Sequence, residues 1–265
     1  MSQSRPQAEL PPRGRNGKNV ANGTHGRRVT QRSGVAGGLL GVVLNLAAAL
    51  PLRAAEAPAV DAATLQRKML LGYQGWFACP GDGSPLNRWT HWARGAPRGD
   101  NLTVDMWPDV SELDADELFP TEMTLADGSP AKLYSAFNAK TVARHFRWMQ
   151  EAGIDGVLVQ RFAGETRDPR HLEFRDQVLR NARVAAERYG RVFAVEYDAS
   201  ARDADQLQRD WQHLVDEVRA TESPRYLRHK GRPVLCVWGF GFSERPGTAE
   251  QAKAFVDWLK TGPEK

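Results

Sequence analysis

Short apolar runs alternate with longer segments of helical spacing from about residue 68 onward. Four apolar runs each predict a strand: Met69–Phe77, Ile154–Phe162, Val192–Tyr197 and Pro233–Phe240. Apolar residues occupy consecutive positions in these runs, which is typical of strands that are buried on both faces. The pattern therefore predicts a parallel sheet.

Four further segments carry apolar residues every three or four positions, which predicts helices over 141–152, 173–189, 203–220 and 248–259. We expect Asn138 or Thr141 to cap the first helix and Thr248 to cap the last. Gly153 and Gly190 are expected to end the first two helices.

Strands that alternate with helices indicate βαβ units, which build either a barrel or a doubly wound sheet. No helix opens with the glycine pattern of a dinucleotide-binding fold, and polar and aromatic residues gather at the strand ends. A barrel carries its active site at those ends. We therefore predict an α/β fold over residues 62–265, a partial (β/α)8 TIM barrel with about the first four to five β/α units. A complete barrel needs eight units, so we expect this chain to be the front part of a longer protein.

The N-terminal segment has a different character. Residues 1–34 are polar and basic, with no apolar period, and we expect them to be disordered. Residues 35–52 are apolar apart from Asn45, basic residues precede them, and Ala55-Glu56-Ala57 follows as a small-residue cleavage pattern. This order predicts a secretory signal peptide over 35–57 and export to the periplasm or the exterior. A retained membrane anchor is the alternative.

Charge is concentrated in the same segment. Residues 1–61 contain eight basic and three acidic side chains, and the other 204 residues contain 28 basic and 29 acidic ones. A nearly neutral folded part argues against a nucleic-acid partner. Two cysteines are too few for a disulfide scaffold or a four-cysteine zinc site. Cys79 follows one predicted strand and Cys236 lies inside a later one, and these two strands should not be neighbours, so we leave the pairing of the cysteines open.

Carboxylates at the strand ends are the candidate catalytic groups. Glu196 interrupts an apolar strand, so we expect it to face the barrel mouth as a general acid or base. Asp198 should point to the same side if the strand continues that far, and the alternative is that it begins the following loop. Glu244, on the loop after the next strand, is either a second carboxylate of the site or a solvated charge on the loop. The alternative for Glu196 is a structural ion pair with Arg161 on the neighbouring strand.

The segment from Ala78 to Lys132 predicts a long loop-rich insertion, because Gly, Pro and Asp cluster there without a helical period. Four of the eight tryptophans fall in or just before it, where they either form a platform for sugar rings or pack the insertion onto the barrel. The candidate substrate-binding residues are Tyr73, Trp76, His91, Trp92, Trp107, Asp109, Gln160, Arg161, Tyr197 and Trp238. The histidines share no ligand spacing, so we expect neither a metal nor another cofactor.

Several strings together resemble the glycoside hydrolase family 71/99-like group, some of whose members are labelled xylosidase/arabinosidase. They are LLGYQGWFACPGDGS, RWTHW, MWPD, YSAFNAKTVARHFRWMQEAGIDGVLVQRF, FAVEYD and VWGFGF. The resemblance implies a (β/α)8 barrel with a glycan site at its C-terminal face. Family 99 endo-α-mannosidases carry two Glu three residues apart after a strand, and they act with retention through the substrate's own 2-hydroxyl. Glu196-Tyr197 resembles the start of that motif, and Ala199 stands at the position of the second Glu.

These observations predict an exported glycoside hydrolase-like protein that acts on a poly- or oligosaccharide with carboxylate acid/base catalysis. The expected partner is a carbohydrate, with no nucleic acid and no membrane after signal cleavage, and the oligomeric state stays open. The alternatives are a catalytically inactive carbohydrate-binding barrel and a non-functional truncated gene product.

Overall fold

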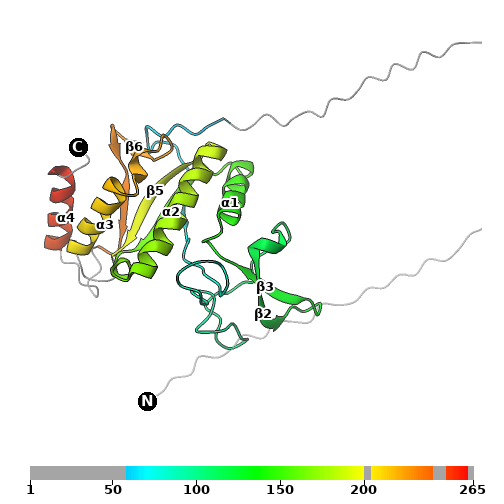
Figure 1. Cartoon of the computed structure of the whole chain (residues 1–265). Coiled ribbons are helices and arrows are strands. Elements are labelled where there is room, and N and C mark those ends of the chain that lie inside the picture. The colour runs from blue at the N-terminus through cyan, green and yellow to red at the C-terminus, as the bar shows by residue number, and fades with distance from the viewer. Residues whose placement is uncertain (1–57, 200–203, 241–248, 262–265) are drawn as a thin grey trace, which may run out of the picture. The chain divides into compact units, whose positions relative to one another are not determined.

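A four-stranded parallel sheet forms the centre of the protein in a computed structural model that describes residues 58–199, 204–240 and 249–261. The strands follow one another across the sheet in chain order: β1 (Leu70–Tyr73), β4 (Gly156–Phe162), β5 (Val192–Asp198) and β8 (Leu235–Trp238). The helices that follow these strands are α1 (Ala139–Glu151), α2 (Pro169–Tyr189), α3 (Ala204–Asp216) and α4 (Ala249–Thr261). Figure 1 shows them side by side, with α1 at one end of the row and α4 at the other.

Helices α1, α2 and α3 contact one face of the sheet. Alternate strand side chains reach them: Tyr73 bonds His145 of α1, and Tyr197 bonds Asp210 of α3. Side chains at the intervening positions, such as Leu158 and Phe162, are only partly buried. A sheet in chain order with helices along one face is the arrangement of a barrel, because a doubly wound sheet carries helices on both faces. The fold is therefore α/β and corresponds to the first four β/α units of a (β/α)8 barrel.

The helix ends confirm the predicted capping residues within the described chain. The Asn138 side chain accepts a hydrogen bond from the amide of Lys140 at the start of α1. Gly190 ends α2 at a φ of 61°, a left-handed conformation that glycine adopts without strain. α2 begins earlier than predicted, because Asp168 caps it and Pro169 occupies the first turn. Thr248 lies outside the described residues.

The insertion between β1 and α1 contains more regular structure than predicted. An antiparallel hairpin joins β2 (Leu118–Thr124) to β3 (Pro130–Tyr134). The prediction of loop here was wrong, because Pro120 and the irregular pairing beyond it weaken the strand signal. A second short hairpin, β6 (Arg228–His229) with β7 (Arg232–Pro233), takes up the start of the predicted last strand.

The main core lies between the sheet and the helices, and a smaller core lies inside the insertion. Phe146, Phe174 and Phe193 are fully buried in the main core. Cys79, Trp92 and Leu133 form the centre of the smaller one. Both cysteines are unpaired.

Residues 58–68 form a strap beside the beginning of β5. The guanidinium of Arg191 donates to the carbonyl of Pro58 at 2.8 Å, and Arg225 donates to the carbonyl of Val60 at 2.9 Å. The amide of Val60 donates to the carbonyl of Gly190 at 2.8 Å. The predicted signal segment lies outside the described residues. Among the described helices, none has the length and apolar character needed to cross a membrane.

Candidate active site

Glu196 lies on the partly exposed face of the sheet, level with its register partners on both neighbouring strands. Its Oε2 accepts a hydrogen bond from Nε2 of Gln160 on β4 at 3.1 Å. Its Oε1 lies 3.7 Å from the Sγ of Cys236 on β8. Burial and the nearby Glu196 carboxylate raise the pKa of Cys236, so the thiol keeps its proton and acts as a donor. Glu196 is thus held between two donors in the carboxyl-terminal half of the sheet.

A second layer of side chains lies two residues further along the same strands. Phe162, Asp198 and Trp238 are register partners on β4, β5 and β8. Trp238 is 41% exposed, and Phe162 and Asp198 are half-buried. β5 includes Asp198, one residue beyond the predicted strand, so this carboxylate stands above Glu196 on the same face. Glu244 lies outside the described residues.

Arg161 does not pair with Glu196 and does not line this face. It is 2% exposed, and its Nε and Nη2 donate to Asp210 of α3 at 2.6 and 2.7 Å, while Nη2 also reaches Asp176 of α2 at 2.8 Å. Successive strand residues point to opposite faces, so a residue next to Gln160 must face the helices. Although burial opposes the charge, the two aspartates hold the pKa of Arg161 above its usual range. Arg161 therefore faces the helices, away from the open face on which the predicted substrate site would lie.

Tyr197 also faces the helices. It is completely buried, and its hydroxyl donates to Asp210 Oδ2 at 2.6 Å. Burial, with the Asp210 carboxylate, raises the pKa of Tyr197 well above its usual value. A side chain so enclosed contributes to packing between β5 and α3 and not to a binding surface.

An aromatic stack stands where β1 and β4 end. Trp76, just after β1, stacks on His91 at a ring distance of 5.1 Å and on Phe162 at 5.0 Å. His91 holds a left-handed backbone with a φ of 62°, which is uncommon outside glycine and is enriched at functional sites. Burial, and next the charge of Arg175, lower the pKa of His91, which favours the neutral ring. Phe162 was absent from the predicted site, although its place at a strand end was a usable signal.

Other predicted aromatic residues fasten the insertion. Trp92 is 2% exposed, and its Nε1 donates to the carbonyl of Tyr134 at 2.9 Å. The Nε1 of Trp107 donates to the carbonyl of Lys132 at 3.1 Å. Trp92 and Trp107 therefore pack the insertion, because the indole N–H of each ring donates to a backbone carbonyl of strand β3.

Tyr73 and Asp109 also lie away from the open face. The Tyr73 hydroxyl lies 2.9 Å from Nδ1 of His145 on α1, in the helix-facing layer. Asp109 is exposed, and its side chain accepts from the amide of Ser111 in a local turn. Of the ten predicted binding residues, Trp76, His91, Gln160 and Trp238 remain at the mouth of the sheet.

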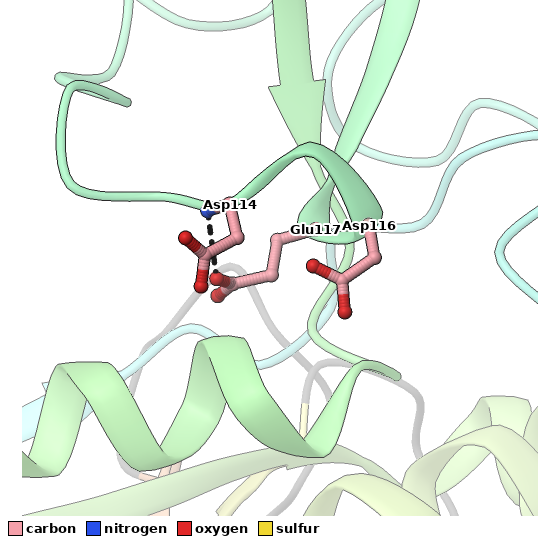
Figure 2. Close-up of side chains that lie close together, drawn as sticks. All are labelled: Asp114, Asp116 and Glu117. Carbon is pink, nitrogen blue, oxygen red and sulfur yellow. Dashed lines mark hydrogen bonds between the residues drawn. The ribbon is translucent and has the colours of Figure 1, made fainter.

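In the described chain, one cluster of acidic side chains is compact enough to suggest a metal site. Asp114, Asp116 and Glu117 converge beside the start of α1, and Figure 2 shows the Glu117 carboxylate accepting from the Asp114 amide. The ammonium of Lys140 lies 2.6, 2.9 and 3.9 Å from these three carboxylates. Arg144 bonds the buried Glu117 at 2.6 Å. Two cations of α1 offset most of the charge of the three carboxylates, and these ion pairs join the insertion to that helix.

Comparisons with known proteins add a distant fold likeness. No protein-family model matches the chain, and no curated protein matches it. Two solved structures of the GH99 endo-alpha-mannosidase from Bacteroides thetaiotaomicron, with and without BIS-TRIS-Propane, are similar at TM-scores of 0.40 and 0.38 and identities of 14% and 16%. They cover 65% and 64% of this chain, and 42% and 44% of the mannosidase chains. The chain thus spans less than half the length of these structures.

Proposed function

We propose that this protein is a glycoside hydrolase-like enzyme that acts on a poly- or oligosaccharide, with Glu196 as its acid or base. One observation carries the proposal: Glu196 lies between the donors Gln160 and Cys236, directly below a layer that contains Phe162 and Trp238. Aromatic faces hold the C–H side of a sugar ring, and a fixed carboxylate beside them is placed to exchange a proton with the glycosidic oxygen or with water.

Asp198 is the proposed second carboxylate. It stands two residues beyond Glu196 on the same face, roughly 6.6 Å along the strand. Glycosidases use two carboxyl groups, one that protonates the leaving oxygen and one that acts as nucleophile or activates water. Trp76 with His91, at the end of β1, would extend the sugar-binding surface on the other side of β4.

Carbohydrate binding without hydrolysis is the second candidate. The resemblance to the family 71/99-like group places Ala199 where a family 99 enzyme carries its second Glu. The amide of Ala199 donates to the carbonyl of Trp238 at 2.9 Å, so this position is fixed in the sheet and offers no carboxylate. A site with Glu196 alone would keep the aromatic surface and lose the second catalytic group.

Export to the periplasm or the exterior is part of the proposal. The packed strap starts at Pro58, whose carbonyl accepts from Arg191, and the small-residue pattern ends at Ala57. Cleavage after Ala57 would therefore leave the packed strap intact. N-terminal sequencing of the protein from the periplasmic fraction should give Pro58 as the first residue, and a product that keeps residues 35–52 would contradict cleavage.

The test compares the unchanged protein with Glu196→Gln on oligosaccharides of xylan, arabinan and α-mannan. We expect turnover of one of them, a loss of at least 100-fold in Glu196→Gln, and unchanged binding by calorimetry. Glu250→Gln, which alters an exposed acid on α4, is the matched control and should keep full activity. Binding without turnover in the unchanged protein would favour the second candidate, and the absence of both would overturn both.

A further inference from the structure

Gln160 and Glu196 are register partners on β4 and β5, and so are the next residues, Arg161 and Tyr197. Side-chain hydrogen bonds join each pair, on opposite faces of the sheet. On the open face, Gln160 bonds Glu196. On the helix face, Arg161 and Tyr197 are both bound by one carboxylate oxygen, Asp210 Oδ2, at 2.6 Å from Arg161 Nε and 2.6 Å from the Tyr197 hydroxyl. One α3 residue, Asp210, therefore joins the two strands on the face opposite the hydrogen bond between Gln160 and Glu196.

This ionic group stands out from the rest of the helix face. Preceding helix-facing positions carry Val157 and Val159 on β4, and Phe193 and Val195 on β5, all buried. A buried ion pair is not needed for stability there, since well-packed apolar residues of similar volume do as well or better. The charges lie only at the carboxyl-terminal end of the strands, where Gln160 and Glu196 are presented.

The group is also anchored from a second helix. Arg161 Nη2 donates to Asp176 Oδ1 of α2 at 2.8 Å, and Nε2 of His213 on α3 lies 2.7 Å from Asp176 Oδ2. Asp210 and Asp176 are 3% and 4% exposed. Two helices thus fix the side chains of Arg161 and Tyr197, and through them the backbone of the residues that precede each one.

We propose that Asp210, with Arg161 and Tyr197, is a positioning device that holds the Gln160 amide and the Glu196 carboxylate in hydrogen-bonding register. A hydrogen bond weakens steeply when its donor–hydrogen–acceptor angle closes below about 120°. A catalytic group needs its supporting contacts to hold it within about 0.5 Å. The proposal rests on the proposed function only in naming Glu196 as the reacting group.

The test follows the titration of the Glu196 side-chain carboxyl by carbon NMR in the full chain, with the signal assigned by Glu196→Gln. Tyr197→Phe removes the hydroxyl and no charge, and Gln160→Leu removes the donor itself. Both should raise the midpoint by about half a unit or more, because each weakens a bond to the ionised form. The double variant, Tyr197→Phe with Gln160→Leu, should shift the Glu196 midpoint no further than Gln160→Leu does alone.

Leu214→Ala is the matched control, because Leu214 is fully buried on α3 and lies outside the ionic group. It should lower the free energy of unfolding and leave the Glu196 midpoint unchanged. Asp210→Asn, read the same way, replaces Tyr197→Phe if the latter does not fold. A midpoint in Tyr197→Phe or Asp210→Asn that equals that of the unchanged protein overturns the proposal. The titration does not require enzymatic turnover. If the protein is inactive but the Glu196 midpoint still shifts in Tyr197→Phe, the proposed function fails and the positioning proposal stands.

Discussion

The side-chain amide of Gln160 donates to the carboxylate of Glu196 across two neighbouring parallel strands, at 3.1 Å from Nε2 to Oε2. Their register makes this contact possible, because partners in adjacent strands point to the same face. Gly72 on β1 leaves the space beside the pair open: a Cβ there would lie 3.3 Å from Gln160 Nε2 and 3.8 Å from Glu196 Oε2. Because Gly72 has no side chain, Gln160 has room to reach Glu196.

Gly72→Val should lower the turnover of an oligosaccharide substrate without lowering the free energy of unfolding. Valine favours strands over glycine, so the free energy of unfolding should stay equal or rise. The added side chain must displace Gln160, and we expect turnover of the active oligosaccharide to fall about tenfold, as a hydrogen bond of about 1.4 kcal/mol would give. Gly99→Ala, where a Cβ meets nothing within 4 Å, is the control and should leave both quantities unchanged. Full activity in Gly72→Val would show that Gln160 can move without cost.

Asp210→Ala should lower the free energy of unfolding by about 3–5 kcal/mol, because it leaves the buried Arg161 with one carboxylate in place of two. Denaturant unfolding at pH 7 measures the change. Lys253→Ala breaks an exposed pair with Asp257 on α4 and should have little measurable effect. Equal effects of the two substitutions would contradict the view that burial sets the cost.

His145 should make the protein less stable in mild acid. Burial lowers the pKa of His145 to about 4, below the value of 6.5 expected in the unfolded chain. The unfolded state therefore binds a proton first as the pH falls, and stability that is complete above pH 6.5 is lost between pH 6.5 and 4. The loss amounts to about 3 kcal/mol. Denaturant midpoints from pH 7.5 to 4.5 should fall more steeply in the unchanged protein than in His145→Gln, and parallel curves would contradict this assignment.

Trp76 and Trp92 should respond in opposite ways to replacement by alanine. Trp76→Ala removes the half-exposed ring at the mouth of the sheet, so we expect oligosaccharide affinity to fall about tenfold with little loss of stability. Trp92→Ala removes a buried ring from the core of the insertion and should cost about 3–5 kcal/mol in stability. Calorimetric binding and denaturant unfolding measure the two effects. Unchanged affinity in Trp76→Ala would remove the aromatic stack from the proposed site.

Much of the fold was predictable because local periodicity records it. Continuous apolar runs predicted the four strands of the sheet, and helical spacing with Asn138 and Gly190 at the ends predicted the first two helices. The β2–β3 hairpin escaped prediction, because its pairing joins residues of an irregular segment and depends on packing against Trp92 and Trp107.

The sequence by itself determined the order of the elements and the presence of a carboxylate, Glu196, inside an apolar strand. Only the tertiary structure decided which neighbours face it. Arg161 and Gln160 are adjacent in sequence and both polar, yet the strand pleat points Arg161 toward the helices and Gln160 toward Glu196. Strand register and the choice of covered face are set by contacts between residues far apart in the chain, and no local pattern contains them.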